Sequence, residues 1–148
     1  MFARLARFAV RALDRAGRIF PKNNQPAEHL VTGQRGEEEA YFHLRRLGYV
    51  IVARNYRSPR HRGELDLVGW DGEVLCFIEV KTRTSREVKP AEAAVDRDKQ
   101  RDLAAVARSY LRRNGGRPSY RFDVVSIYFD QDTVPAEITL FKNAFSVA

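Results

Sequence analysis

Two stretches of the chain repeat apolar residues at the three- and four-residue spacing of a helix. One helical face is formed by Glu37, Ala40, Tyr41, Leu44 and Leu47, and Gly48 predicts the end of that helix. A second, longer face is formed by Lys99, Leu103, Val106, Ala107 and Tyr110, up to the stop signal at Asn114. We therefore expect two amphipathic helices, each with one buried face.

Apolar and β-branched runs between and after these helices predict strands. They cover residues 49–55, 64–70, 74–82, 121–129 and 137–141. Asp71-Gly72, between the second and third runs, is a strong hairpin signal. The order of helix, three strands, helix and further strands predicts a mixed α/β sandwich.

The first 28 residues differ from this body, which we place at residues 29–148. Five arginines are three or four residues apart and form one stripe of a basic amphipathic helix: Arg4, Arg7, Arg11, Arg15 and Arg18. A linker is predicted at residues 21–26, between two prolines. The segment is either an anchor for DNA or a membrane surface, or a loosely tethered extension, which we favour.

Composition excludes several classes of protein. A single cysteine, Cys76, excludes a disulfide framework and a four-cysteine zinc site, and its apolar neighbours indicate an ordinary buried thiol. The longest apolar run has five residues, far below the ~18 of a membrane span, so we expect a soluble, cytoplasmic protein. Its net charge of +7 favours an anionic partner.

The predicted hairpin gathers acidic residues on one face of the sheet. If Asp71 and Gly72 form the two-residue loop, then Asp66 faces Phe77 and Glu64 faces Glu79. Glu64, Asp66, Glu79 and Lys81 then share a face, with Asp66 and Glu79 as diagonal neighbours about 7–8 Å apart. Both carboxylates could reach one cation.

The charges favour the same interpretation. Glu64, Asp66 and Glu79 would repel one another across the strands, and Lys81 neutralises only part of that charge. Mg²⁺ or Mn²⁺, bound by carboxylates, the Val80 carbonyl and waters, would neutralise the rest. A Glu-Val-Lys segment alone is more typical of a solvated strand face; the convergence of separate segments, including Glu37 on an otherwise apolar helix face, favours a functional site.

Seven short motifs, in order and with their spacing kept, resemble the YraN family of bacterial proteins, within the PD-(D/E)xK nuclease superfamily that includes archaeal Holliday-junction resolvases. They are Gly36-Glu37-x-x-Ala40, Gly48-Tyr49, Arg54-Asn55-Tyr56-Arg57, Gly63-Glu64-Leu65-Asp66-Leu67, Phe77-Ile78-Glu79-Val80-Lys81-Thr82-Arg83, Lys99-Gln100 and Arg121-Phe122-Asp123-Val124-Val125. The resemblance runs from about Gly33 to Phe145. Leu65 stands where the superfamily motif has proline, before the carboxylate that matters for chemistry.

The resemblance implies a restriction-endonuclease-like fold, in which helices flank a central mixed β-sheet. It implies that Asp66 and Glu79 bind metal, that Lys81 is the catalytic lysine and that Glu37 is a helix-borne acid. Glu37 could hold a second ion or a water molecule. Glu64 could be an outer ligand or a partner of Lys81.

Basic residues near these acids are candidates for phosphate contacts. The candidate nucleic-acid-binding residues are Arg54, Arg57, Arg60, Arg62, Arg83 and Lys99. A further run could equally bind DNA or be solvated surface: Arg108, Arg112, Arg113, Arg117 and Arg121.

The sequence therefore favours a Mg²⁺- or Mn²⁺-dependent endonuclease that hydrolyses DNA phosphodiester bonds, with branched or repair intermediates as the suspected substrates. The alternative is a non-catalytic nucleic-acid-binding protein that keeps the nuclease fold. Glycosidic acid–base chemistry also uses paired carboxylates, but Lys81 beside the acids argues against it. Similarity to resolvases also suggests a homodimer.

Overall fold

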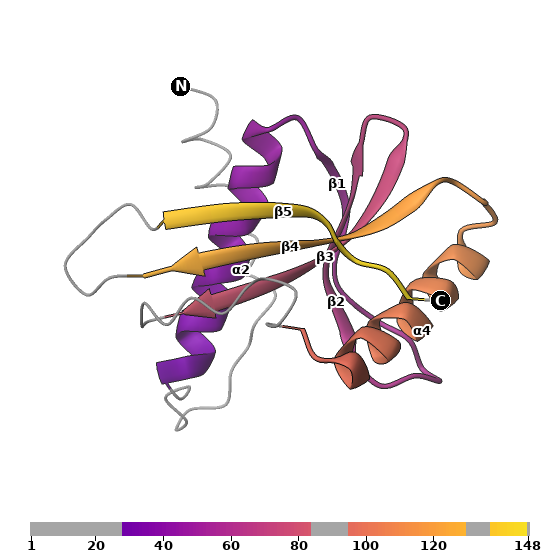
Figure 1. Ribbon diagram of the computed structural model, residues 1–148, viewed down its shortest axis with the longest axis horizontal. Coiled ribbons are helices and arrows are strands. Elements are labelled where there is room, and N and C mark those ends of the chain that lie inside the picture. Colours follow the sequence, from indigo (N-terminus) through magenta and orange to yellow (C-terminus); the bar gives the residue numbers. More distant parts are fainter. Residues whose placement is uncertain (1–27, 84–94, 130–136, 148) are drawn as a thin grey trace, which may run out of the picture.

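The computed structural model describes residues 28–83, 95–129 and 137–147 (Figure 1). The elements in chain order are α2 (Glu28–Arg46), β1 (Val50–Arg57), β2 (Glu64–Asp71), β3 (Val74–Arg83), α4 (Arg97–Arg113), β4 (Tyr120–Tyr128) and β5 (Glu137–Phe145). The basic segment and linker predicted before Glu28 lie outside the described residues. Within the described part of the chain, no helix has both the length and the apolar character needed to cross a membrane.

The five strands form one mixed sheet in the order β1-β2-β3-β4-β5. The pairs β1–β2, β2–β3 and β4–β5 are antiparallel, whereas β3 and β4 are parallel and are joined by the crossover that contains α4. The predicted α/β fold, a central mixed sheet flanked by helices as in restriction endonucleases, is confirmed. The first helix begins at Glu28, earlier than its apolar spacing predicts, and β5 extends to Phe145.

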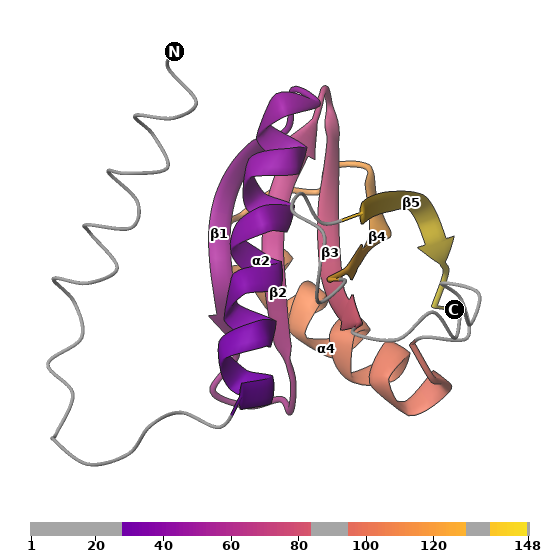
Figure 2. The same ribbon diagram turned by 90° about the vertical axis from the view of Figure 1, so that its left-hand side faces the viewer.

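Each helix covers one face of the sheet (Figure 2). Ala40 and Leu44 of α2 pack with Leu67, Ile78 and Val125 in one core. Another core forms between the opposite face and the apolar side of α4, from residues that include Leu65, Phe77, Leu103, Val106 and Val124. Two cores separated by the sheet hold both helices in place, and the strands between them carry the predicted site.

The β2–β3 hairpin is shifted by two residues from the predicted register. Asp71 pairs with Val74, so the two loop residues are Gly72, with φ of 60°, and Glu73. Asp71 remains in the strand, where its carboxylate binds Arg121 of β4 and Lys142 of β5. A shift of two does not by itself change the face of a side chain. Alternation nevertheless breaks within β2, because Leu65 packs in the core beside α4 and Leu67 in the core beside α2, and the expected pairing of Glu64 with Glu79 is wrong.

Strands β2 and β3 separate at the end away from this loop. Their last paired residues are Leu67 and Ile78. Beyond that point β2 stays with β1 as far as Glu64, while β3 stays with β4 as far as Arg83. Figure 1 shows the result, because β3 and β4 run across the view while β1 and β2 run down it. Asp66 and Glu79 are the next residues on the two separating strands.

A buried polar network fastens the sheet near the hairpin loop. Asp123 is fully buried and accepts hydrogen bonds from Arg121 Nε at 2.8 Å, from Tyr49 Oη at 3.2 Å and from the Asn143 backbone N–H at 2.9 Å. Arg121 also donates to Asp71 at 2.6 Å. Arg121 is therefore not part of an exposed basic surface, contrary to its place at the end of the arginine run.

The thiol of Cys76 lies in the core near this network. It is fully buried, and burial, followed by the negative charge of Asp123, raises its pKa to about 12. The interpretation of Cys76 as an ordinary buried thiol is confirmed.

Close packing of α2 against β3 depends on Gly36. A Cβ at this position would overlap Thr82 Oγ1 and would lie 3.1 Å from its Cβ and 3.3 Å from its Cγ2. Rotation of the threonine side chain moves its two branches but not its Cβ, which would still lie 3.1 Å away, so helix and strand must also shift slightly apart. The glycine lets the helix approach the strand immediately beside Glu37 and Lys81.

We predict that Gly36→Ala lowers the free energy of unfolding by about 1–3 kcal/mol, as overpacking does. Gly33 in the same helix is the matched control, because an added Cβ there meets no atom of the described residues within 4 Å. Gly33→Ala should stabilise the protein by roughly 0.5–1 kcal/mol through helix propensity. Urea unfolding of both variants checks the pair; equal stabilisation by the two alanines would contradict the close contact.

Candidate functional site

Asp66 bridges the gap where β2 and β3 separate. The backbone N–H of Val80 has lost its strand partner and donates instead to Asp66 Oδ2 at 2.8 Å. This hydrogen bond holds the Asp66 carboxylate beside Glu79, the residue that precedes Val80. The two acids are therefore near enough for the charge of Glu79 to act on Asp66.

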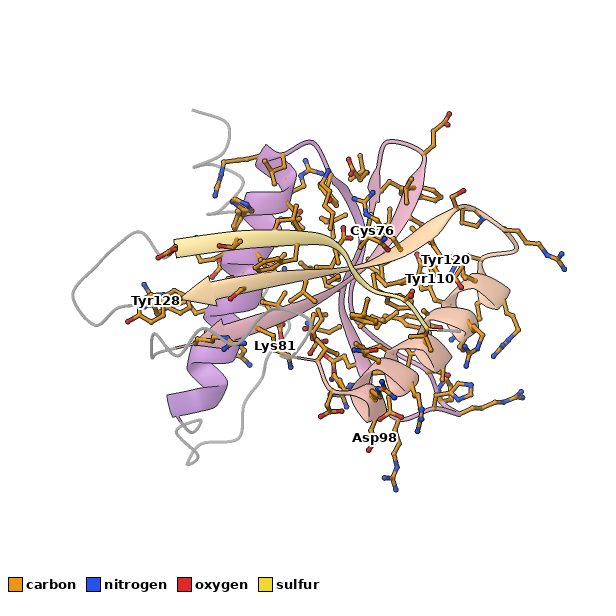
Figure 3. All side chains as sticks on the ribbon, in the orientation of Figure 1. Cys76, Lys81, Asp98, Tyr110, Tyr120 and Tyr128 are labelled. Atoms are coloured by element: carbon orange, nitrogen blue, oxygen red, sulfur yellow. The ribbon has the colours of Figure 1, made fainter. Side chains whose placement is uncertain are left out.

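Glu79 is an acid almost removed from solvent, with 5% of its surface exposed. Its Oε1 lies 3.0 Å from Lys81 Nζ and 3.6 Å from Lys99 Nζ, whose side chains reach it from β3 and α4. Figure 3 shows Lys81 on the part of β3 toward its arrowhead, away from Cys76. The other oxygen, Oε2, is buried and has no hydrogen-bond partner among the described residues. A buried carboxylate oxygen without a partner is costly, so Oε2 is the atom most in need of a cation or a donor.

Burial, together with repulsion by the neighbouring acids, raises the pKa of Asp66. Burial and then the negative charge of Glu79 raise the pKa of Asp66 to about 8, with a further upward contribution from Glu37. The Val80 N–H and the charge of Lys99 act in the opposite direction. Raised values of this size are typical of sites that use a cation or a proton for their chemistry.

Glu37 reaches the same region from α2. Burial and then the charge of Glu64 raise its pKa, whereas Arg54 and Asn55 lower it. With its amide nitrogen turned toward the acids, Asn55 donates to Glu37 Oε2 at 3.0 Å and to Glu64 Oε1 at 2.7 Å. Asn55 has a φ of 49°, a left-handed conformation that asparagine tolerates better than most residues. This bridge holds two like-charged side chains together.

The structure therefore collects the four residues predicted to be catalytic around the separating strands. Asp66, Glu79 and Lys81 form its centre, and Glu37 interacts with both acids through its charge. Glu64 lies farther out, where it pairs with Arg57 rather than with Lys81.

The predicted nucleic-acid-binding residues occupy different environments. Arg54 lies over the Tyr41 ring at 5.0 Å, and Arg57 is paired with Glu64. Lys99 points at Glu79, and Arg83 is half-buried at the end of β3. Arg60 and Arg62 are exposed on the loop between β1 and β2, which packs against α4 through Gly63.

The arrangement does not form a complete ligand cage by itself. Among the described residues, no three carboxylate, imidazole or thiolate groups are grouped as a ready-made metal site. Mg²⁺ does not require such a cage, because it commonly takes one or two carboxylates and keeps several waters. Two adjacent acids and the unpartnered Oε2 of Glu79 fit this kind of ligation.

Sequence reasoning missed two contributions to this site. Asn55 had no assigned role, although an asparagine amid β-branched and basic residues at a strand end was a signal for a special backbone conformation. Lys99 is a predicted phosphate contact, and its ammonium also lies at Glu79, a contact that the sequence did not predict. Its position at the start of an apolar helix face was the available signal.

We predict that Asp66 makes the metal-free protein less stable as pH rises from 3.8, the ordinary pKa of the group, to about 8. The folded state binds the Asp66 proton more tightly than the unfolded state, so its contribution is full below the first value and lost above the second. Asp66→Asn can still accept from Val80 but cannot titrate. Urea unfolding in EDTA should show a stability difference between variant and wild type that changes across this range; a constant difference would contradict the shift.

Comparison with known proteins shows the family to which this chain belongs. The matching family model is that of the uncharacterised protein family UPF0102, over residues 36–127. A UPF0102 protein of Koribacter versatilis is 56% identical over 137 residues, which cover 93% of this chain and 92% of that protein. One from Solibacter usitatus is 45% identical over 116 residues, covering 78% of this chain and 86% of that protein. The chain belongs to the uncharacterised protein family UPF0102, the YraN family that its motifs resemble.

Proposed function

We propose that this protein is a divalent-metal-dependent endonuclease that hydrolyses phosphodiester bonds in DNA. The observation that carries the proposal is the buried Glu79 carboxylate, next to a second acid of raised pKa. One of its oxygens lies beside lysine, and the other has no partner in the part of the chain that the structure describes. Resemblance to nucleases supplies the class of reaction, and the arrangement of charge supports it.

Asp66 Oδ1, Glu79 Oε2 and the Val80 carbonyl are the atoms that we expect to hold Mg²⁺ or Mn²⁺. Asp66 Oδ2 is already engaged by the Val80 N–H, which leaves Oδ1 for the cation. Such an ion, when bound, neutralises charge on the phosphate and makes water a better nucleophile near neutral pH. Glu37 could bind a second ion or a water molecule at the side of the site nearest α2.

The residues of the chain have distinct parts in the reaction. The oxygen of a water molecule attacks phosphorus, one P–O ester bond breaks, and the departing oxygen takes up a proton, which leaves a phosphomonoester and an alcohol. Lys81 keeps its proton and orients the attacking water or stabilises negative charge on the phosphate oxygens. Glu79 is buried, so the ammonium of Lys81 beside it lies in surroundings of lower dielectric constant than water, where its charge interacts more strongly.

Contacts to the DNA backbone fit the exposed loop between β1 and β2. Arg60 and Arg62 are its exposed basic residues, and the loop leads directly into Glu64 and Asp66. Side chains there could hold phosphates on either side of the bond that is cut. We propose branched or repair intermediates as the substrates. We also propose that the protein acts as a homodimer, which could cut two strands. The free, buried thiol of Cys76 fits a cytoplasmic location.

We predict that Glu79→Gln and Lys81→Ala each reduce metal-dependent nicking by about 10²-fold or more, because they remove a ligand charge and the ammonium beside it. Glu73→Gln is the matched control, since this exposed glutamate lies in the hairpin loop at the far end of β3. Pure protein should be incubated with linear, single-stranded and four-way DNA in Mg²⁺, Mn²⁺ or EDTA.

The same cleavage assay distinguishes the proposed endonuclease from the alternative function. A non-catalytic nucleic-acid-binding protein would bind these DNAs in a salt-sensitive way but cut none of them with any metal. Cleavage that survives unchanged in both site variants would reject the site, and thermal unfolding of each variant shows whether the fold is intact.

A further inference from the structure

Two lysines from separate elements share one oxygen of Glu79. Lys81 reaches Oε1 from β3 at 3.0 Å and Lys99 reaches it from α4 at 3.6 Å. The side chains of both lysines are about one-third exposed, at 31% and 35%, whereas that of Glu79 is 5% exposed. One ammonium is enough to neutralise the Glu79 carboxylate, so once a cation neutralises the neighbouring acids the second ammonium is available for another anion.

The count of charges indicates which anion is missing. Glu37, Asp66 and Glu79 supply three negative charges when ionised, and the two lysines supply two positive ones. A bound divalent cation would leave the group with a single excess positive charge, which one phosphodiester balances. Without Lys99 the metal-loaded group would be neutral and would not attract a phosphate.

The first turn of α4 holds Lys99 in place. The Asp96 carboxylate accepts from the Lys99 backbone N–H at 2.8 Å, which caps the helix. Gln100 Nε2 donates to the carbonyl of Val95 at 2.8 Å, and Val95 is buried in the core under α4. The backbone of Lys99 is therefore fixed, while its long side chain can move between nearby anions.

The charge of Lys99 acts on both central acids. It contacts Glu79 directly, and it lowers the pKa of Asp66 against the larger effects of burial and Glu79. A residue placed only for DNA binding would face outward, as Arg101 does on the same helix, where it is exposed and paired with Asp98 at 3.5 Å.

We propose that Lys99 is a second catalytic ammonium, which leaves Glu79 when the cation binds and neutralises a non-bridging oxygen of the phosphate that is cut. The proposal rests on the proposed nuclease function. Lys99 keeps its proton throughout and acts by charge alone, so it is complementary to Lys81 at the same carboxylate.

The test compares Lys99→Ala and Lys99→Arg with Arg101→Ala, which removes the same charge from the same helix outside the site. With Mn²⁺ and saturating DNA, Lys99→Ala should lower kcat about 10²-fold while KM changes by less than about threefold. Lys99→Arg should recover part of the rate, and Arg101→Ala should change neither constant by more than about threefold. A raised KM with unchanged kcat would overturn the proposal in favour of a phosphate contact outside the reaction.

Binding of Mn²⁺ by calorimetry gives a readout that does not depend on cleavage. Loss of a neighbouring positive charge should tighten Mn²⁺ binding about threefold or more in Lys99→Ala and leave it unchanged in Arg101→Ala. Equal affinity in Lys99→Ala and wild type would overturn the proposal. If wild type cuts DNA and Lys99→Ala cuts it equally well, only the role of Lys99 fails; if wild type binds Mn²⁺ but cuts no DNA, the nuclease function fails and the catalytic role with it.

Discussion

The separation of β2 from β3 is the constraint on which the site depends. A continuous ladder would have used the backbone groups on both strands and left no room between them. Because pairing stops at Leu67 and Ile78, the Val80 N–H needs another acceptor, and Asp66 provides it. The Asp66 carboxylate, which completes this backbone hydrogen bonding, is thereby brought beside Glu79. The strand separation that ends the β2–β3 pairing thus also places the two acids together.

The two helices supply the other charged residues of the site, Glu37 from α2 and Lys99 from α4. Gly36 lets α2 approach β3 closely, which brings Glu37 toward the acids. On the opposite face, the capped first turn of α4 aims Lys99 at Glu79. The two hydrophobic cores thus fix the positions from which an acid and an ammonium reach the same gap, and the polar network around Asp123 holds the other end of the sheet.

The sequence was sufficient to predict the elements and most of the site because the signals were local. Alternation in β2 and β3 predicted that Asp66, Glu79 and Lys81 lie together, and they do so despite the two-residue error in register. The error arose because Asp-Gly permits two hairpin registers, and the choice is made by Arg121 and Lys142, which are remote in sequence. The Asn55 bridge and the contact of Lys99 with Glu79 could not be predicted for the same reason, since these partners come together only after folding.

The edges of the sheet suggest how this protein avoids uncontrolled self-assembly. Pairing between β1 and β2 is irregular between Ile51 and Ala53, and pairing between β4 and β5 is irregular between Phe122 and Val124. Asn143 adopts a left-handed conformation beside the second irregularity. Since regular outer strands are templates for further chains, such local bends hinder the stacking of molecules edge to edge, even though Val50 and Val52 leave one margin partly apolar.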